Sequence, residues 1–256
     1  MPLFDFAKNW TNFSKRSLSF EVIRAAEESI KNLLSRDNLT NYSFLDVGCG
    51  SGIFSIAARK LGACPVLGID ISQGCVELSK ENSRKVGVDG IDFQIVSALD
   101  NKKLAEMQYD LVYAWGSLHH TGSMWEAIKN CSKAVAPSGK FVLAIYNKHS
   151  TSSLWAYIKY FYVQSPSFLQ VPIVILFSAV IYIAKFAVTF KNPLIKQRGM
   201  NFWHDVIDWV GGYPYEYATS DEVIKFIENL GFKLNRVISA EVPTGCNEFV
   251  FDKADV

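Results

Sequence analysis

The sequence predicts a doubly wound α/β fold, in which a mostly parallel sheet carries helices on both faces. Short apolar strands alternate with helical stretches between Phe44 and Tyr146, and this alternation is typical of parallel sheets. The first strand also breaks into three alternate glycines, Gly48, Gly50 and Gly52, and then opens directly into a helical pattern. Ligands of such sheets bind beyond the carboxyl ends of the strands, so we expect the functional site there.

The composition allows one full domain and excludes some classes of partner. A chain of 256 residues with 49% hydrophobic content can bury a large core, and we expect a single domain. Its 26 basic and 25 acidic side chains are spread along the chain, so nucleic acid is not an expected partner. The five cysteines form no C-x-x-C pair and no zinc spacing, and the N-terminus lacks a signal-peptide pattern, which indicates a cytoplasmic protein.

The first 40 residues are expected to form a helix preceded by an aromatic segment. Apolar residues recur at helical spacing between Ser19 and Ser35, and Ser19 is a candidate cap for this amphipathic helix. Four aromatic residues lie between 4 and 13. This segment either docks on the sheet through its aromatics or forms a lid in which Trp10 or Phe13 covers the ligand.

The glycine loop indicates what kind of ligand binds. Glycine allows positive φ and close approach of the backbone, and the N–H groups of the following helix favour an anionic group. However, Ile53 stands where the dinucleotide motif requires a third glycine, which disfavours an NAD-dependent oxidoreductase. Asp46 would repel a pyrophosphate and attract an ammonium or sulfonium group. Cys49 is interpreted as a small packing residue rather than a nucleophile.

Three further strands are expected to end at the same edge of the sheet. The strand over 64–70 ends in Asp70, a carboxylate that would face a ribose diol. The strand over 91–96 leads into Ser97, and the strand over 109–114 leads into the loop 115–120. A turn over 137–140 is expected to precede the fifth strand.

Together these loops resemble the cofactor site of class I S-adenosylmethionine-dependent methyltransferases over about residues 40 to 147. Within that superfamily, the loop 117–121 is similar to the branch of ubiquinone-biosynthesis O-methyltransferases. The resemblance implies a Rossmann-like seven-stranded sheet with the last strand antiparallel, S-adenosyl-L-methionine as cofactor, and a small-molecule methyl acceptor with a lipophilic or quinone-like hydroxyl. N- or C-methylation of a small metabolite and a non-catalytic S-adenosylmethionine-binding protein remain alternatives.

The resemblance also implies roles for individual residues. Gly48 and Gly50 would contact the methionyl part, Asp70 the ribose, and the Trp115 carbonyl the methionine end. The family usually has an acidic residue at the position of Ser97, so either Ser97 or Asp100 would accept the hydrogen bond from the adenine amino group. The expected cofactor-binding residues are Trp10, Asp46, Gly48, Cys49, Gly50, Gly52, Asp70, Ile71, Ser97, Ala98, Leu99 and Trp115.

Deprotonation of the acceptor is the chemistry left to the protein. A phenol-like hydroxyl has a pKa near 10, so a general base is expected, and histidine titrates nearest to neutral pH. His119 and His120 follow the fourth strand, and we expect His120 to face the acceptor unless it bonds a carbonyl instead. His204 and Asp208 would share a helix face. The expected catalytic residues are His120, His204 and Asp208. His204, Asp205, Asp208 and Glu216 match no strong metal motif, so no metal is expected.

The remaining chain is expected to add a hydrophobic insertion and to complete the sheet. A capped helix should start at Thr219 and stop at Gly231, followed by strands over 233–240 and 247–251. The single domain 1–256 is thus divided into a lid and helix over 1–40, a cofactor-binding core over 41–149, an insertion with a substrate-contacting segment over 150–218, and a final helix and strands over 219–256.

Within the insertion, residues 171–190 are apolar enough for a helix about 30 Å long, the thickness of a bilayer core. A true span would put the two halves of one sheet on opposite sides of the membrane. We therefore expect either a buried lid, a homodimer through 154–190, or a hairpin that makes peripheral contact with one leaflet. Lysines and an arginine around the segment are candidate headgroup anchors: Lys159, Lys185, Lys191, Lys196 and Arg198.

Overall fold

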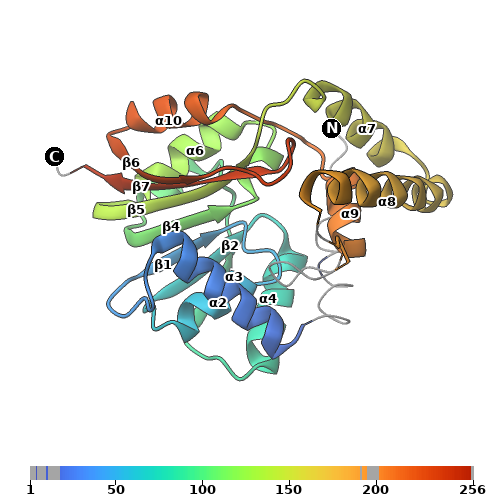
Figure 1. Ribbon diagram of the computed structural model, residues 1–256. Helices are drawn as coiled ribbons and strands as arrows, with labels where there is room; N and C mark the ends of the chain where they lie inside the picture. Colours follow the sequence, from blue (N-terminus) through green and yellow to red (C-terminus); the bar gives the residue numbers. More distant parts are fainter. Residues whose placement is uncertain (1–3, 5–9, 11–17, 191, 195–201, 255–256) are drawn as a thin grey trace.

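Seven strands form one central sheet, and helices cover both of its faces (Figure 1). The computed structural model describes residues 4, 10, 18–190, 192–194 and 202–254, except for the side chains of residues 204 and 205. The strands lie in the order β3-β2-β1-β4-β5-β7-β6. Their bounds are β1 Phe44–Val47, β2 Val66–Asp70, β3 Ile91–Ile95, β4 Tyr109–Trp115, β5 Val135–Tyr146, β6 Phe232–Ile238 and β7 Cys246–Lys253.

The strand directions confirm the sheet that the sequence predicted. β1 pairs in parallel with β2 and β4, and β2 with β3. β7 lies between β5 and β6 and is antiparallel to both, with Phe141 opposite Phe251. The carboxyl ends of β1, β2, β4 and β5 therefore meet at one edge, where ligands of such sheets bind.

The fifth strand begins earlier than predicted. The residues expected as a turn, 137–140, lie inside β5, because Val135 already pairs with Tyr109 of β4. The register then shifts between Tyr109 and Leu111, and Ser138 has a φ of 56°. An irregularity of this kind adds residues to one strand without ending the pairing.

Two groups of helices pack on opposite faces of the sheet. Apolar side chains of α2 and α3 cover one face, and those of α5, α6 and α10 cover the other. The helices are α2 Phe20–Leu34, α3 Ile53–Lys60, α4 Gln73–Lys85, α5 Asn101–Ala105, α6 Met124–Lys133, α7 Ser152–Gln164, α8 Ser167–Thr189, α9 Phe202–Gly211 and α10 Ser220–Glu228, with a 3₁₀ turn, η1, at Leu118–His120.

The predicted helix caps are present. The Ser19 hydroxyl accepts a hydrogen bond from the Val22 N–H at the start of α2. Thr219 and Glu222 form a reciprocal capping box at the start of α10, and Gly231 follows this helix with a φ of 89°. These caps act over three residues, so they could be identified from the sequence.

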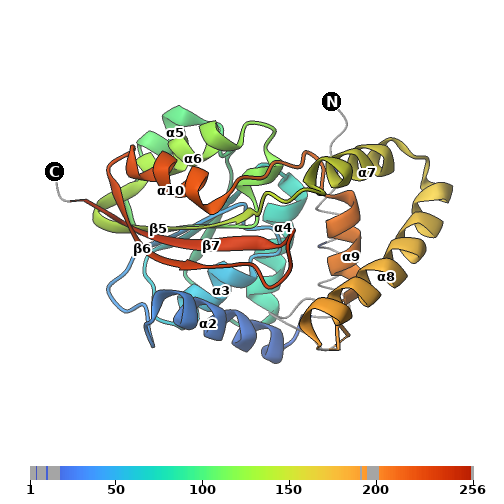
Figure 2. The same cartoon turned by 45° about the horizontal axis from the view of Figure 1, so that its top comes forward.

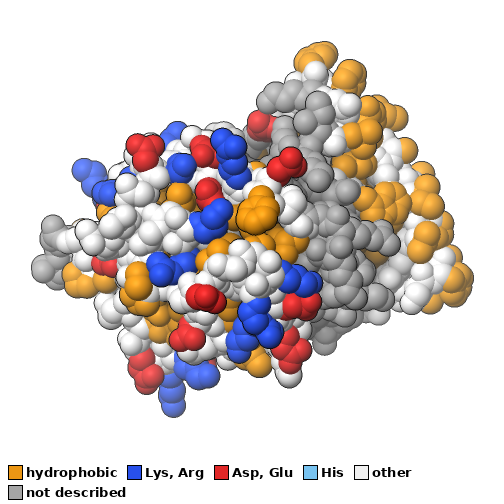
Figure 3. Space-filling view, turned by 90° about the horizontal axis from the view of Figure 1, so that it is seen from below, with side chains coloured by type: hydrophobic (Ala, Val, Ile, Leu, Met, Phe, Trp, Pro, Cys, Tyr) orange, Lys and Arg blue, Asp and Glu red, His pale blue; other side chains and the backbone are white. Residues whose placement is uncertain are grey.

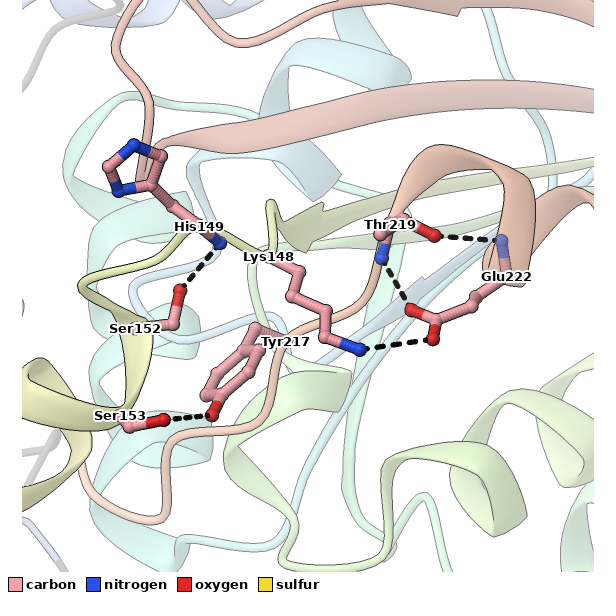
Figure 4. A network of polar contacts seen from close by, with 7 residues as sticks. All are labelled: Lys148, His149, Ser152, Ser153, Tyr217, Thr219 and Glu222. Carbon is pink, nitrogen blue, oxygen red and sulfur yellow. Dashed lines mark hydrogen bonds and ion pairs between the residues drawn. The ribbon is translucent and has the colours of Figure 1, made fainter.

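The insertion (150–218) holds α7, α8 and α9, which lie together at one end of the sheet (Figure 2). Its two ends are tied to each other. The Lys148 N–H donates to the Ala218 carbonyl, the Ala218 N–H donates to the Tyr146 carbonyl, and the Lys148 ammonium lies 3.2 Å from the Glu222 carboxylate (Figure 4). The chain therefore leaves the sheet at β5 and returns to the same place before α10.

Candidate functional site

The glycine loop after β1 fits closely against its neighbours. Gly48 has a φ of 75°, and a Cβ added there would lie 2.3 Å from the Ser117 Cβ. The Ser117 hydroxyl in turn donates to the Val47 carbonyl at 2.7 Å. Gly52 also has a positive φ, and a Cβ there would lie 2.8 Å from the Ser79 Cβ. Larger residues would move the loop, so Gly48 allows it to pack on the end of β4 and Gly52 allows it to pack on α4.

Asp70 at the end of β2 is bonded to this loop. One carboxylate oxygen accepts the Gly50 N–H at 3.0 Å, and the other accepts the Ser72 N–H at 2.9 Å. Burial raises the pKa of Asp70, while these backbone bonds oppose the rise. Ile71, beside it, is exposed. The carboxylate is thus oriented at the edge of the sheet, as the ribose prediction requires.

Asp46 lies beneath the loop rather than on its surface. Its carboxylate is buried and accepts the Ser55 hydroxyl at 2.6 Å. Burial raises the pKa of Asp46 to about 7, and the nearby Asp70 charge raises it further. Its influence on a bound cation would therefore be electrostatic and not a direct contact.

Cys49 and the third strand end are engaged in local contacts. Burial raises the pKa of the Cys49 thiol well above its usual range, and the sulfur lies 3.7 Å from the Ser79 hydroxyl. The Ser97 hydroxyl accepts the Leu99 N–H at 3.1 Å, and Asp100 caps α5 through the Lys103 N–H. Ala98, between them, accepts a hydrogen bond from Asn130 at 3.4 Å.

Trp10 lies on the glycine loop. A Cβ added to Gly50 would be 3.2 Å from the Trp10 ring nitrogen. Trp10 and Trp115 pack on the same apolar cluster, and Trp115 also contacts Phe54 with 6.0 Å between ring centroids. This placement fits both alternatives for Trp10, a docked aromatic and a lid over the ligand, and Phe13 lies outside the described residues.

The loop after β4 and the segment 212–218 are joined by several hydrogen bonds. His120 Nδ1 lies 2.7 Å from the Pro214 carbonyl oxygen, and the Glu216 N–H donates to the His119 carbonyl at 2.9 Å. The Glu216 carboxylate accepts the Met124 N–H at the start of α6. The loop after β4 is therefore held against the segment 212–218, and His120 bonds a carbonyl, the alternative that the sequence left open.

Both histidines of this loop are held in their neutral form. Burial, and after it the charge of Lys159, lowers the pKa of His120 to about 3. Burial also lowers the pKa of His119 well below its usual range, and its ring lies against Tyr146 with 4.1 Å between centroids. As the structure stands, His120 is a weak base at neutral pH.

Lys159 of α7 is the titratable group that the sequence interpretation missed. It was expected to anchor a lipid headgroup, but the structure contradicts this because the side chain is fully buried. Its ammonium donates to the Trp209 carbonyl near the end of α9, and lies 4.8 Å from the centre of the Tyr215 ring and 5.5 Å from that of Tyr146. A carbonyl at a helix C-terminus and aromatic faces both stabilise a cation.

Burial lowers the pKa of Lys159 to about 7, although the Asp208 charge opposes this change. We expect a measurable effect on stability. In the unfolded chain the lysine keeps its proton up to about 10.5, so between these pH values the unfolded state binds more protons. The free energy of unfolding should therefore rise above pH 7, by up to about 1.4 kcal/mol per pH unit. Below pH 7, Lys159 is protonated in both the folded and the unfolded chain, so its contribution to the free energy of unfolding does not change with pH.

Urea unfolding of the parent and of Lys159→Met between about pH 6 and pH 9 would measure this contribution. The rise should be absent from Lys159→Met and retained in Lys102→Met, a control at an exposed position of α5. Parallel stability curves for the parent and Lys159→Met would contradict the prediction.

The other predicted catalytic residues are only partly described. His204 belongs to α9, but its side chain lies outside the described residues, as does that of Asp205. Asp208 is half-buried and lies close enough to Lys159 to favour its charged form. Among the described residues, no three His, Cys, Asp or Glu side chains are grouped as metal ligands would be.

Comparisons with known proteins identify the family to which the chain belongs. A family model described as a methyltransferase domain matches residues 38–168, about half of the chain. A ubiquinone biosynthesis O-methyltransferase from Coxiella burnetii is 26% identical over 154 residues, which cover 60% of this chain and 64% of the relative. This chain thus spans less than two thirds of the length of the first curated relatives it matches.

Two further comparisons involve other kinds of methyltransferase. A ribosomal protein L11 methyltransferase from Lactobacillus johnsonii is 49% identical over 72 residues, 28% of this chain and 22% of the relative. The crystal structure of magnesium protoporphyrin IX methyltransferase from Synechocystis PCC 6803 with bound SAH superposes with a TM-score of 0.59 at 16% identity, covering 96% of this chain and 94% of that one. This structural likeness shows that the fold is shared.

Proposed function

This chain belongs to the class I S-adenosylmethionine-dependent methyltransferases, and from this we propose that it transfers a methyl group to the hydroxyl oxygen of a small, lipophilic molecule. One observation supports the proposal most. The glycine loop and the cluster of His119, His120 and Lys159 lie at the same edge of the sheet, where Gly48 packs on Ser117 one turn before the two histidines.

The residues of the glycine loop and at the end of β2 fit S-adenosylmethionine. Gly50 allows the Trp10 ring to lie close to the glycine loop, because a Cβ there would be 3.2 Å from the ring nitrogen. The Asp70 carboxylate is oriented by backbone N–H groups at the end of β2, where it would accept hydrogen bonds from the ribose. Asp46, beneath the loop, would favour the positive charge of the donor once ionised.

S-adenosylmethionine supplies a methyl carbon that its sulfonium activates, so that the bond from acceptor oxygen to carbon forms as the bond from carbon to sulfur breaks. The hydroxyl proton must pass to the protein or to water. A base whose pKa lies near neutrality is suited to this step, because it is deprotonated yet still accepts a proton readily.

We propose that Lys159 is the base that accepts the hydroxyl proton. Burial brings the pKa of Lys159 to about 7, whereas that of His120 is lowered to about 3. The Nζ atom is buried and lies over the rings of Tyr146 and Tyr215, whose centroids are 4.9 Å apart. The acceptor would therefore have to displace one of these rings to reach it. Catalytic hydrogen bonds often form only in such a complex.

Lipophilic acceptors are favoured by the surroundings of Lys159. Its neighbours in the cluster are the rings of Tyr146, Trp209 and Tyr215. Such rings bind apolar and aromatic compounds better than polar metabolites. We place the reaction in the cytoplasm, in keeping with the five free cysteines.

The proposal predicts selective donor binding and selective methylation. Titration calorimetry should detect binding of S-adenosylmethionine and none of NAD. Mass spectrometry should then find one added methyl group on an alkyl-substituted catechol, but none on the matching alkyl amine or on ribosomal protein L11. Gly52→Val is the control, since its side chain would collide with Ser79 and abolish donor binding. Methylation of the amine or of the protein, with the catechol unchanged, would contradict the hydroxyl acceptor.

A further inference from the structure

The α8 helix exposes an unusually apolar face. It is long and apolar enough to cross a membrane, yet only 6% of its most apolar 18-residue stretch is buried. Val174 is its single buried residue. The exposed side chains include Phe168, Val171, Ile175, Leu176, Ile183 and Phe186. In the space-filling view, hydrophobic side chains gather at the end of the molecule that carries the insertion, whereas charged side chains are scattered over the sheet domain (Figure 3).

Several polar groups of α8 and of the α7–α8 connection are bonded within the hairpin itself. The hydroxyls of Ser178 and Thr189 donate to the carbonyls one turn earlier, at 2.6 and 2.7 Å. Ser165 does the same at 2.8 Å, and the Gln170 amide donates to carbonyls at the end of α7. Groups satisfied in this way can enter an apolar environment without losing hydrogen bonds to water.

The helix nevertheless does not cross a bilayer. The insertion leaves and rejoins the sheet at one point, where Tyr146 and Lys148 bond Ala218. In addition, Ile173, Phe177 and Ile181 of α8 pack with Val206 and Val210 of α9. Because one side of α8 is covered by protein and both ends of the insertion meet, the helix can only present its outer face to a membrane.

We propose that the α7–α8 hairpin lies flat in one leaflet of a lipid bilayer, with the outer face of α8 among the acyl chains. Successive helical residues are turned by about 100°, so the exposed side chains from Val171 through Phe186 to Val180 cover about half of the circumference. A single partner helix contacts a narrower stripe, such as the a/d seam of a coiled coil. A leaflet surrounds the whole exposed half at once.

The charge distribution also favours lipid over a second copy of the chain. Lys185 is the single charged residue of α8 and is half-buried. Protein interfaces have a polar rim, and even homodimer interfaces are only about 65% apolar. On α7, Tyr157, Tyr160 and Phe161 are exposed, and such aromatics are typical of the boundary between acyl chains and headgroups.

Apolar contact, rather than charge, is therefore expected to supply the binding. Of the candidate headgroup anchors, Lys159 is buried and Lys185 is half-buried, and no role is assigned to Lys191, Lys196 and Arg198, which lie outside the described residues. Because the exposed side chains of α8 are apolar, the full chain should bind vesicles of phosphatidylcholine alone, without phosphatidylglycerol. This inference does not depend on the acceptor, so it can fail while the proposed reaction holds.

Flotation of the purified full-length protein with both kinds of vesicle tests the proposal. The double variant Leu176→Glu/Ile183→Glu changes side chains that are 63% and 66% exposed, and we expect the partition coefficient to fall at least about tenfold. The matched control is Ile95→Glu/Val237→Glu, with side chains 50% and 40% exposed on β3 and β6, and it should float like the parent. Binding of S-adenosylmethionine by each variant shows that it is folded.

Three results would overturn the proposal. The parent could fail to float with either vesicle. It could float only with phosphatidylglycerol and equally well as the α8 variant, which would indicate an electrostatic contact elsewhere. Analytical ultracentrifugation without lipid could also show a dimer that the α8 variant abolishes, while the parent does not float, in which case a second copy covers this face.

Discussion

Replacing Lys159 by Met should lower the turnover number by about 10²–10⁴-fold while leaving the affinity for S-adenosylmethionine within a few-fold of the parent. The pKa of the lysine, about 7, suits proton transfer from a hydroxyl, and the lysine lies in the aromatic cluster at the end of β5. The pKa of Asp46 is also about 7, but Asp46 is buried beneath the glycine loop, where it accepts the Ser55 hydroxyl. Single-turnover kinetics with saturating donor would separate this step from product release.

His120→Asn is the matched comparison. The asparagine amide can take the place of Nδ1 in donating to the Pro214 carbonyl, so the loop contact is kept while the ring is lost. We expect less than a tenfold fall in turnover. The parent rate should also rise with pH through about 7, because a deprotonated Lys159 is required, and Lys159→Met should lose this rise. A purely structural role for Lys159 would leave the pH profile unchanged.

Two other outcomes are informative. If His120→Asn loses activity and Lys159→Met keeps it, His120 is the base, as the sequence predicted. If both variants keep turnover within a few-fold, His204→Ala is the remaining test. Should that variant also keep turnover, catalysis rests on alignment of the donor and acceptor alone. Donor titration on the same samples excludes unfolding as the cause of any loss.

The parts of the fold that could be predicted from the sequence are those in which the cause lies close by. Ser19 and Thr219 cap helices through partners three residues away. The alternate glycines mark a turn that has positive φ at Gly48, Gly50 and Gly52. The predicted start of β5 was wrong, because the observed start depends on a register shift against β4. This contact joins two separate segments, so the local sequence pattern does not reveal it.

The surroundings of Lys159 and His120 could not be predicted from the sequence, because contacts between distant segments form them. Lys159 is buried by Trp209, 50 residues later, and His120 bonds Pro214, 94 residues later. Neither contact leaves a periodic pattern in the sequence. One indication was available, since Lys159 is the single charged residue in the apolar sequence of α7. An isolated charge of this kind requires a buried partner or a function.

Replacing Asp70 by Ala should weaken the binding of S-adenosylmethionine by roughly 1–3 kcal/mol, or about 5- to 150-fold. The carboxylate is positioned at the end of β2, and its two oxygens accept the Gly50 and Ser72 N–H groups, so the side chain is oriented before the donor binds. A charged acceptor that is already oriented loses little entropy on binding a ribose diol. Titration calorimetry gives the affinity directly.

A donor analogue distinguishes contact with the ribose from support of the loop, because Asp70→Ala also releases the Gly50 N–H. The parent should bind a 2′,3′-dideoxy analogue of S-adenosylhomocysteine about as weakly as Asp70→Ala binds S-adenosylhomocysteine itself. Asp70→Ala should bind the two compounds almost equally, since it lacks the carboxylate that would accept hydrogen bonds from the ribose hydroxyls. Asp100→Ala, which removes only the cap of α5, is the control and should still discriminate between them. If Asp70→Ala discriminates as strongly as the parent, Asp70 supports the glycine loop without contacting the ribose.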